Sequence, residues 1–559
     1  MLRRLLESMD GPRAIVLIAG VFALLLALFI QGALPAMLPE TRRDTVTRVV
    51  RTGLGELKWV HAKAVPYTEL ELRGRRVYQR EGCWYCHSQY VRPVNDEERR
   101  WGPVSEAGEY AFDVPHFWGT QRIGPDLQRV GLKYANGWHY AHHWDPRLVV
   151  PDSNMPAFTW LFRAPVEAEV VEGEDGQPAL ADTPAVRALG LDPKAEAVLP
   201  LFPGPDGVTF VPVVDALHGR LVDNRGKRPV LRFGHAREFR AKRVTLLAPT
   251  EELAALVAYV QKLGTARGKW RDAFAPQRAF ADGNFAFDTG PQEAAFGRVV
   301  YERRCAGCHG AQGDGWGGAA TFFDVQPRDF RLGVFKFRST PSGSLPTDGD
   351  LLRTLTNGVR GTAMPTWHEL PFKERIAVIR YLKTFSDRWQ QEAPPASIGI
   401  AAVPPPASAE LLARGKEVWV EAKCAQCHGD AGKGDGPSAP DLEDDFGFPI
   451  LPADLTTGLF KSGAGVRDIF RTMSTGLDGT PMPSFADAFP KEEDRWALAY
   501  YVLALSAYVD PLYATPEPLP AEVRQVLDDP KAAHPTPALA YRWTDPADRR
   551  LPVYEMPFR

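Results

Sequence analysis

Three copies of one short motif constrain this chain more than any other feature. In each copy, two cysteines are separated by two residues and followed at once by a histidine. The copies are Cys83, Cys86 and His87; Cys305, Cys308 and His309; and Cys424, Cys427 and His428. Two thiols at this spacing can form thioethers to the vinyl groups of one haem, and the histidine can reach the iron. Disulfides or zinc sites are the alternatives, but the three motifs use all six cysteines of the chain, which favours three covalent haems c.

The length and composition of the chain set broad limits. At 559 residues it is too long for one core, and the length predicts several domains. The hydrophobic share of 44% is that of a globular protein. The formal charge of −3 gives no global attraction to nucleic acid, which we exclude as a partner. Fifty prolines and 49 glycines indicate loop-rich structure, which suits small domains whose core is partly porphyrin.

An apolar run from Ala14 to Ile30 predicts a membrane anchor. As a helix it approaches the roughly 20 residues that cross a hydrocarbon core. A cleaved signal peptide is the alternative, but its apolar region is usually only about 7–15 residues long. Arginines flank both ends, so the positive-inside rule does not set the orientation. Because haem attachment takes place outside the cytoplasm in bacteria, we expect the residues after Pro39 to be periplasmic and the anchor to lie in the cell membrane.

A longer pattern repeats in step around the three motifs. Each motif follows an amphipathic helix with Gly-x-x-Val-aromatic, and each module closes with a helix carrying Tyr-(Val/Leu)-x-x-(Leu/Phe). The opening copies are Gly74–Tyr78, Gly297–Tyr301 and Gly415–Trp419, and the closing copies are Tyr259–Leu263, Tyr381–Phe385 and Tyr501–Leu505. The glycine lets the second helix approach closely, and the aromatic fills the crossing beside the haem. One such copy suits any helix pair, but three in step predict three cytochrome c folds.

Each module also offers one methionine followed by proline before its closing helix. Met155, Met364 and Met482 lie 68, 55 and 54 residues after the motif histidines. Proline stiffens such a loop, so that the thioether can be held against the iron. We therefore predict that His87 and Met155, His309 and Met364, and His428 and Met482 are the axial ligands. Such ligation fills the iron and raises its reduction potential relative to two histidines, so the sites should pass electrons.

The methionine assignments have alternatives. Core packing is one for each residue, and Met473 is a rival for the third haem. Met556-Pro557 follows the last helix and has no motif to serve, so the dipeptide alone proves nothing. We also expect each motif imidazole to be oriented by a backbone carbonyl. The candidate loops are Gly124–Leu127, Pro327–Phe330 and Pro452–Leu455.

His139, His142 and His143 form a cluster shortly before Met155. Residues three or four apart share a helix face, so a metal site is one interpretation. We favour residues at a haem edge or an interface.

The expected fold is mainly α, with one transmembrane helix and three cytochrome c-type haem domains. The predicted boundaries are 1–40 for the anchor, 41–265 for module 1, 290–390 for module 2, 408–508 for module 3 and 509–559 for a Pro-rich strap. A disordered tail is the alternative for the strap. Module 1 carries a β-containing insertion at about 163–248, with β-like runs at 208–214, 229–233 and 243–247. Its basic stretch, 219–243, could dock a partner or lie near lipid headgroups, but a solvated face is favoured.

From Pro66 to Leu161 the chain closely resembles subunit II of cbb3-type cytochrome c oxidase, the mono-haem subunit CcoO or FixO. The segments that carry the resemblance are 66–72, 86–93, 107–110, 124–127, Trp138 with His139 and His142, and 150–156. The resemblance implies His87 and Met155 as axial ligands and a place beside the catalytic haem–copper subunit, CcoN. After Thr265 the chain resembles dihaem cytochrome c modules. In this family a separate dihaem subunit, CcoP, delivers electrons to subunit II, so the fusion could replace it.

The leading hypothesis is an electron-transfer subunit of a cbb3-type oxidase that reduces O2. Electrons would come from a soluble or membrane cytochrome c or from a quinol-oxidising complex. The chain is not expected to be an enzyme on its own, because one membrane helix offers no embedded histidines for two haems and a copper. The alternatives are a membrane-tethered electron shuttle, a subunit of a nitric oxide-reducing complex, and a multihaem peroxidase, which would need an open iron.

Overall fold

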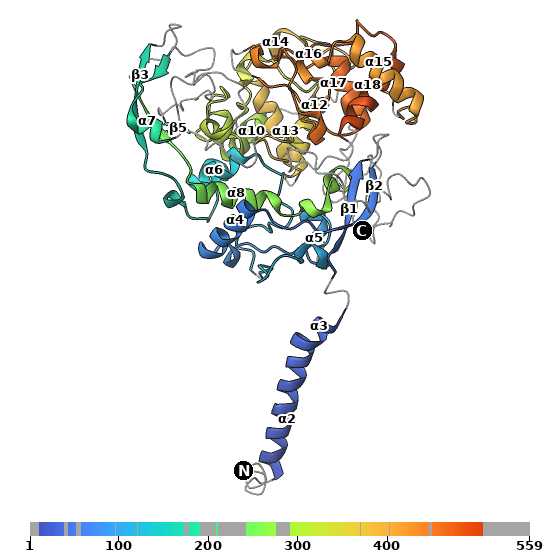
Figure 1. The fold of residues 1–559 in the computed structure, drawn as a ribbon. Coiled ribbons are helices and arrows are strands. Elements are labelled where there is room, and N and C mark those ends of the chain that lie inside the picture. Colours follow the sequence, from blue (N-terminus) through green and yellow to red (C-terminus); the bar gives the residue numbers. More distant parts are fainter. Residues whose placement is uncertain are drawn as a thin grey trace.

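The computed structural model describes most of the chain. The described residues are 11–38, 43–51, 57–94, 97–119, 121–172, 178–189, 208–210, 242–274, 291–368, 370–401, 403–445 and 450–506. They form a largely helical body with small sheets and one N-terminal helix that projects from it (Figure 1). The predicted Pro-rich strap and Met556 lie outside the described residues.

The projecting helix is α2 (Gly11–Leu28), which continues through η1 (Phe29–Ala33) and α3 (Leu34–Met37). No residue of the apolar segment Ile15–Ala33 is buried against the rest of the protein. It is the only helix within the described ranges that is long and apolar enough to cross a membrane. Exposure of so much apolar surface to water is unfavourable, so the finding agrees with a membrane anchor.

A β-hairpin that we did not predict follows the anchor. Its strands, β1 (Thr45–Arg51) and β2 (Leu57–Lys63), are antiparallel and pair Thr45 with Lys63. β-Branched residues dominate β1, which is the composition that favours a strand. The Lys269 N–H donates to the Val49 carbonyl at 2.9 Å, so the hairpin joins the residues that follow module 1.

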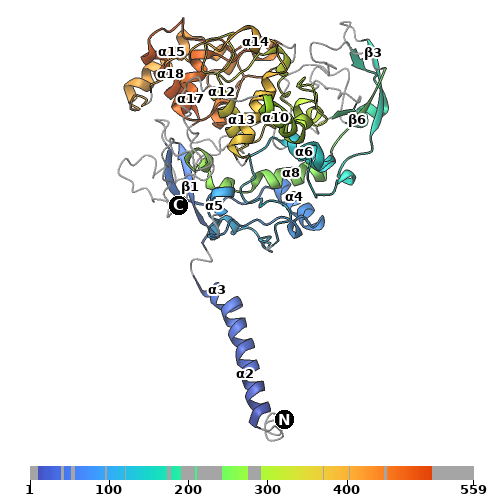
Figure 2. The same cartoon turned by 180° about the vertical axis from the view of Figure 1, so that it is seen from behind.

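Three pairs of helices form the frame of the modules. The pairs are α4 (Glu69–Arg80) with α8 (Glu251–Lys262), α10 (Pro291–Arg304) with α13 (Phe372–Lys383), and α15 (Ala409–Glu421) with α18 (Glu492–Leu505). Both views show α10 and α13 at a level between the other two pairs (Figures 1 and 2). The pairs match the predicted opening and closing helices.

The glycines at the three crossings are sterically required. A β-carbon on Gly74, Gly297 or Gly415 would overlap a backbone carbonyl of the closing helix. Beside each glycine an aromatic ring of the opening helix contacts a tyrosine of the closing helix. The ring centroids are 5.4 Å apart for Tyr78 and Tyr259, 5.4 Å for Tyr301 and Tyr381, and 5.7 Å for Trp419 and Tyr501. The predicted close approach and aromatic filling are therefore confirmed.

Shorter elements complete the modules. In module 1 they are η3 (Cys83–Tyr85), α5 (Glu97–Trp101), η4 (Ala107–Tyr110), α6 (Asn136–Trp144), η5 (Pro146–Leu148) and η6 (Thr159–Leu161), followed by η7 (Thr265–Arg267) and α9 (Trp270–Phe274). In module 2 they are α11 (Ala306–His309), η8 (Ala320–Phe322), η9 (Phe330–Leu332), α12 (Asp348–Asn357) and α14 (Arg388–Gln391). In module 3 they are α16 (Ala425–His428), η10 (Ala439–Asp441), η11 (Leu455–Thr457) and α17 (Val466–Thr475).

The insertion in module 1 contains a four-stranded sheet. Its strands are β3 (Val166–Glu172), β4 (Pro178–Leu180), β5 (Val208–Phe210) and β6 (Arg243–Leu247), in the order β4-β3-β6-β5, with α7 (Pro184–Ala188) beside them. Ala168, Val186 and Leu246 form part of its separate small core. Two of the three predicted β-like runs thus contain strands. The third, 229–233, and the basic stretch before Lys242 lie outside the described residues.

Modules 1 and 2 share one hydrophobic core. Trp138 and Tyr140 of α6 are buried in the same cluster as Phe322 and Phe323 of module 2. A β-carbon on Gly137 would overlap the Phe322 carbonyl, so α6 lies directly on module 2. This continuous core positions the first two modules against each other.

Polar contacts join all three modules. The buried Asp272 carboxylate of α9 pairs with Arg51 of β1 at 3.1 Å and also with Arg360 of module 2. Lys269 donates to the Thr457 carbonyl of module 3 at 3.1 Å. The Pro-rich spacer between modules 2 and 3 contacts both of them. Its Ile398 N–H donates to the Ser339 carbonyl, and Tyr500 donates to the Pro405 carbonyl.

Candidate haem sites

Each cysteine motif lies on a short helical turn. The histidine N–H donates to the carbonyl of the first cysteine, at 3.0 Å in module 1 and 2.9 Å in modules 2 and 3. Residues at positions i, i+3 and i+4 of such a turn share a face, so both thiols and the imidazole face the same side. No disulfide joins any of the six cysteines, so both thiols of each motif are available to a haem. Within the described ranges, no group of three or more His, Cys, Asp or Glu side chains is arranged to hold a metal ion.

A backbone carbonyl orients each motif imidazole, as the sequence predicts. His87 Nδ1 lies 2.8 Å from the Pro125 carbonyl, His309 Nδ1 lies 3.2 Å from that of Arg328, and His428 Nδ1 lies 3.2 Å from that of Ala453. A carbonyl can only accept, so Nδ1 carries the proton and the Nε2 lone pair is left for a metal. In module 1 a β-carbon on Gly124 would overlap the His87 ring, so glycine is required there.

The imidazoles are held in their neutral form. Burial lowers the pKa of His87 and of His428, and it lowers the pKa of His309 to about 4. A protonated imidazole has no lone pair for iron. At neutral pH the three rings are therefore in the state that a metal requires.

An aspartate stabilises each loop whose carbonyl binds the motif histidine. Asp126, Asp329 and Asp454 each accept a hydrogen bond from the backbone N–H two residues further on, at 2.9, 2.9 and 3.0 Å. Such Asx turns hold the local backbone in one conformation. The aspartate directly follows the residue whose carbonyl binds the histidine, so it acts as a positioning residue for the ring.

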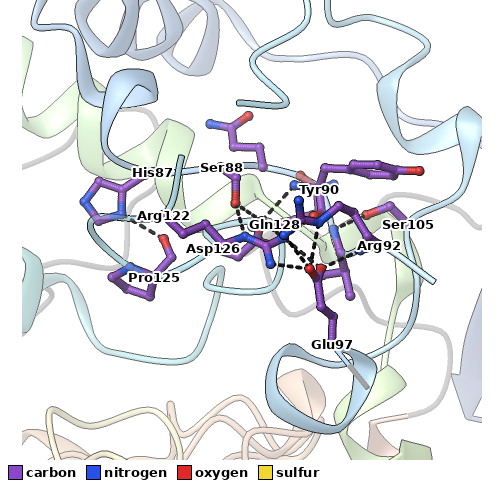
Figure 3. A network of polar contacts seen from close by, with 12 residues as sticks. His87, Ser88, Tyr90, Arg92, Glu97, Ser105, Arg122, Pro125, Asp126 and Gln128 are labelled. Atoms are coloured by element: carbon purple, nitrogen blue, oxygen red, sulfur yellow. Dashed lines mark hydrogen bonds and ion pairs between the residues drawn. The ribbon is translucent and has the colours of Figure 1, made fainter. Parts of the chain in front are cut away.

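In module 1 this aspartate belongs to a larger buried network (Figure 3). Asp126 also accepts from the Ser88 hydroxyl at 2.6 Å and from the Tyr90 N–H at 2.9 Å. Arg122 donates to Ser88 Oγ at 2.6 Å and, on its other side, to Glu97 at 2.8 Å. The network thus joins the residue after His87 to the loop that orients the His87 ring.

Removing Asp126 should cost more than removing its counterpart in module 3. Asp126→Ala leaves several buried donors without an acceptor, and we expect it to destabilise the chain by about 3 kcal/mol. Asp454 is half-buried and accepts hydrogen bonds from the nearby Thr456, and Asp454→Ala should cost about 1 kcal/mol. Denaturant titration of the two variants measures the difference. Equal losses would contradict a special role for the module 1 network.

The same network predicts a loss of stability in acid. Burial would raise the pKa of Glu97, but hydrogen bonds from Arg122 and Arg92 outweigh burial and lower it to about 2. A carboxyl whose pKa is depressed in the folded state stabilises it above the unfolded pKa of roughly 4.5, and this contribution disappears as the pH falls toward 2. The thermal midpoint should therefore fall more steeply between pH 4.5 and 2 in the wild type than in Glu97→Gln. Parallel curves would contradict the assignment.

The three methionine loops share a hydrogen bond that we did not predict from the sequence. The N–H of Met155 donates to Ser153 Oγ at 3.2 Å, that of Met364 to Thr362 Oγ1 at 3.1 Å, and that of Met482 to Thr480 Oγ1 at 3.2 Å. The hydroxyl residue always stands two positions before the methionine. Aligning the three copies would have revealed the pattern Ser/Thr-x-Met-Pro. A hydroxyl on one side and a proline on the other restrict the loop.

The predicted methionine ligands are less buried than Met473. Met155, Met364 and Met482 are all half-buried, in loops before the closing helices. Met473, the rival in module 3, is buried within the module 3 core on α17. Met482 packs against the same core cluster, which also contains Cys424. The environment of Met473 is that of a packing residue.

The histidine cluster lies at the boundary between modules 1 and 2. His139, His142 and His143 belong to α6, which packs on η8 of module 2. His139 is 3% exposed, and its Nε2 has no hydrogen-bond partner within the described part of the chain. His142 stacks on Trp138 with centroids 4.6 Å apart. The position agrees with interface residues rather than with a separate metal site.

The residues of each module fit a covalently bound haem. Two free thiols lie beside an imidazole whose Nε2 is available, and a thioether stands in a restricted loop before the closing helix. This donor set is that of a c-type cytochrome with axial histidine and methionine.

Comparison with known families supports this interpretation. Residues 55–185 match the family described as cytochrome c oxidase, mono-heme subunit/FixO. Residues 292–382 match cytochrome c oxidase, cbb3-type, subunit III, and residues 412–506 match cytochrome c. None of the curated proteins matches the chain. Among solved structures, a reducing HAO-like protein complex from Kuenenia stuttgartiensis is 44% identical, over 38% of this chain and 95% of that one, with a TM-score of 0.37.

The fold and the three motif sites define the chain as a c-type cytochrome built from tandem modules. Its FixO region, followed by a subunit III region, makes it a membrane-anchored electron-transfer subunit of cbb3-type cytochrome c oxidase. Subunits of these kinds are not catalytic on their own.

Proposed function

We propose that the chain carries three covalent haems c and joins the roles of two oxidase subunits in one polypeptide. The cysteine pairs of the three modules hold the haems, and His87/Met155, His309/Met364 and His428/Met482 are the axial pairs. The observation that carries the proposal is the threefold repeat of the site: in every module a carbonyl orients the imidazole and a hydroxyl fixes the methionine loop.

Bound haem supplies a carrier that takes up and releases one electron. The chain keeps the imidazoles neutral by burial and restricts the loops on both sides of each site. It also joins modules 1 and 2 through one continuous core, so the first two sites are held at a constant separation. We propose that electrons enter through modules 2 and 3, which replace a separate CcoP subunit, and leave through module 1.

The partner of module 1 in this proposal is the catalytic haem–copper subunit, which reduces O2. The FixO match of this region supports the assignment. The donor is a soluble or membrane cytochrome c, or a quinol-oxidising complex. All three modules face the periplasm, because covalent haem attachment takes place there and the anchor precedes every motif.

Purification of the complex in mild detergent tests the proposal. The intact mass of this chain should exceed the protein mass by three haems, and b-type haems of the catalytic subunit should copurify. Fewer than three haems would contradict the haem assignment. A separate dihaem subunit in equal amount would contradict the replacement of CcoP.

A further inference from the structure

A pocket between modules 2 and 3 is lined by cations. Its cavity volume, measured for water-sized groups, is about 20 Å³, and its lining includes Lys336, Arg338 and Arg353 of module 2 with Lys461 and Arg471 of module 3. No acidic residue lines it in the part of the chain that the structure describes. A positive pocket of this kind favours anions. We call these five residues the cationic pocket.

The two modules contribute equivalent positions to the cationic pocket. Lys336 stands eight residues after Arg328, whose carbonyl orients His309, and Lys461 stands eight residues after Ala453, whose carbonyl orients His428. Both lysines come three residues after a left-handed glycine, Gly333 or Gly458. The lysines are therefore placed by the same local fold, and each module brings its own to the shared pocket.

The arginines of the pocket are equivalent as well. Arg353 of α12 and Arg471 of α17 each pair with the aspartate three residues earlier, at 2.6 and 2.8 Å. Arg338 reaches across the module boundary to Asp478 at 2.6 Å. These pairs neutralise the arginine charges, so the positive charge that remains comes from the lysines.

Both lysines lack an ion pair within the described ranges. Burial, together with the nearby Arg328 and Lys461, lowers the pKa of Lys336 to about 7, although Asp444 acts in the opposite direction. Burial also lowers the pKa of Lys461. Arg338 is only 1% exposed, and its Nη1 has no hydrogen-bond partner among the described residues. A cation or donor that is largely removed from water and has no partner costs free energy, so half-buried Lys336 and Lys461 and buried Arg338 favour anionic oxygen atoms in the pocket.

The pocket lies near the histidine loop of module 2 and near the methionine loops of modules 2 and 3. On the histidine side, Arg328 is close enough to affect the pKa of both His309 and Lys336. On the methionine side, Gly358 lines the pocket and packs against Pro365, directly after Met364. In module 3, Thr475 lines the pocket and precedes Gly476, which packs against Pro483. The lining of the pocket is therefore adjacent to the methionine loops of both modules.

We infer that the cationic pocket receives the propionate carboxylates of the haems of modules 2 and 3, with Lys336 and Lys461 as their charged partners. The inference rests on the proposed function, because it needs a haem in both modules. Each haem carries two propionates, so the anionic oxygen atoms that the lysines lack would come from the cofactors themselves. The positive charge favours the reduced state of both haems.

Redox titration of the full-length chain in its complex tests the inference. Lys336→Met and Lys461→Met keep the volume of the side chain but remove its charge. Each should make reduction of the adjacent haem about tenfold less favourable, which corresponds to about 59 mV for one electron. The double variant should lower the reduction potentials of the haems of modules 2 and 3 and leave that of the haem of module 1 unchanged. Lys336→Arg and Lys461→Arg keep the charge and should retain wild-type potentials.

Matched controls separate this effect from a general loss of charge. Lys373 of α13 and Lys416 of α15 are exposed lysines in the same two modules, and Lys373→Met and Lys416→Met should leave all potentials unchanged. Unchanged potentials in the pocket variants, with three haems still attached, would refute the inference and leave the proposed function intact. If the potentials of the arginine variants shifted as far as those of the methionine variants, packing rather than charge would cause the shift. That result would also refute the inference.

Inorganic phosphate distinguishes bound cofactor from a free anion. The wild-type potentials should not change with phosphate concentration, because the carboxylates already occupy the pocket. A phosphate-dependent shift that disappears in the double variant would assign the pocket to solvent anions and overturn the inference. Intact mass provides the separate test of the proposed function, since a wild-type chain with fewer than three haems would remove the basis of both.

Discussion

Replacing Met155 with alanine should abolish the sulfur-to-iron absorption band of one haem in three. The haem of module 1 should also lose the high potential that a thioether ligand provides. Each tenfold loss in the reduction equilibrium is about 59 mV for one electron, so a modest drop already makes this haem a poor carrier. We expect oxygen consumption by the complex to fall roughly tenfold or more. Absorption spectroscopy and oxygen uptake measure the two effects on the same preparation.

Two further variants show whether the effect belongs to ligation. Met482→Ala should remove the same band from a different haem. Met473→Leu conserves the volume of a buried core side chain and should leave all bands in place. An unchanged spectrum in Met155→Ala would mean that Met155 is not the ligand, and a lost band in Met473→Leu would favour the rival assignment in module 3.

Gly297→Ala should destabilise module 2, although alanine is the better helix former. The substitution gains up to about 1 kcal/mol in helix propensity. However, the new β-carbon would overlap the Ala377 carbonyl and press on Tyr381, so α10 and α13 must separate. Overpacking of this kind costs about 1–3 kcal/mol and occasionally more, and here it acts on the crossing that closes the haem site. We expect a net loss of about 2 kcal/mol, measured by denaturant titration followed at the haem absorption.

Gly399 provides the matched control. It lies in the spacer after module 2, and a β-carbon there would meet no atom within 4 Å, so Gly399→Ala should be neutral. Gly74→Ala and Gly415→Ala should resemble Gly297→Ala, because the same carbonyl contact recurs in their modules. A stabilised Gly297→Ala protein would show that the helices are not in the close contact described here.

Local patterns predicted the frame of the modules because each part of the frame depends on near neighbours in the chain. The Cys-x-x-Cys-His turns, the crossing glycines and the carbonyls of Pro125, Arg328 and Ala453 all follow from short segments. The hydroxyls before the three methionines also follow a local pattern, which comparison of the three copies would have revealed. The hairpin β1–β2 was missed although its β-branched residues favour a strand.

Contacts between distant segments could not be predicted in the same way. Arg122 joins Ser88 to Glu97, and Asp272 joins β1 to module 2. The sequence around Arg122 and Asp272 does not indicate these partners. The cationic pocket is a further case, because Lys336 and Lys461 lie 125 residues apart and each has the appearance of an ordinary surface lysine in the sequence.

The sequence by itself determined that this protein has an apolar anchor segment, three haem-attachment motifs and three helix pairs built on one plan. These properties depend on residue spacing, since a helical turn places residues three and four apart on one face wherever it occurs. Only the tertiary structure decided that modules 1 and 2 share a core and that the lysines of modules 2 and 3 meet in one pocket. Those features depend on how finished modules pack, and packing is a property of surfaces that form only after the chain has folded.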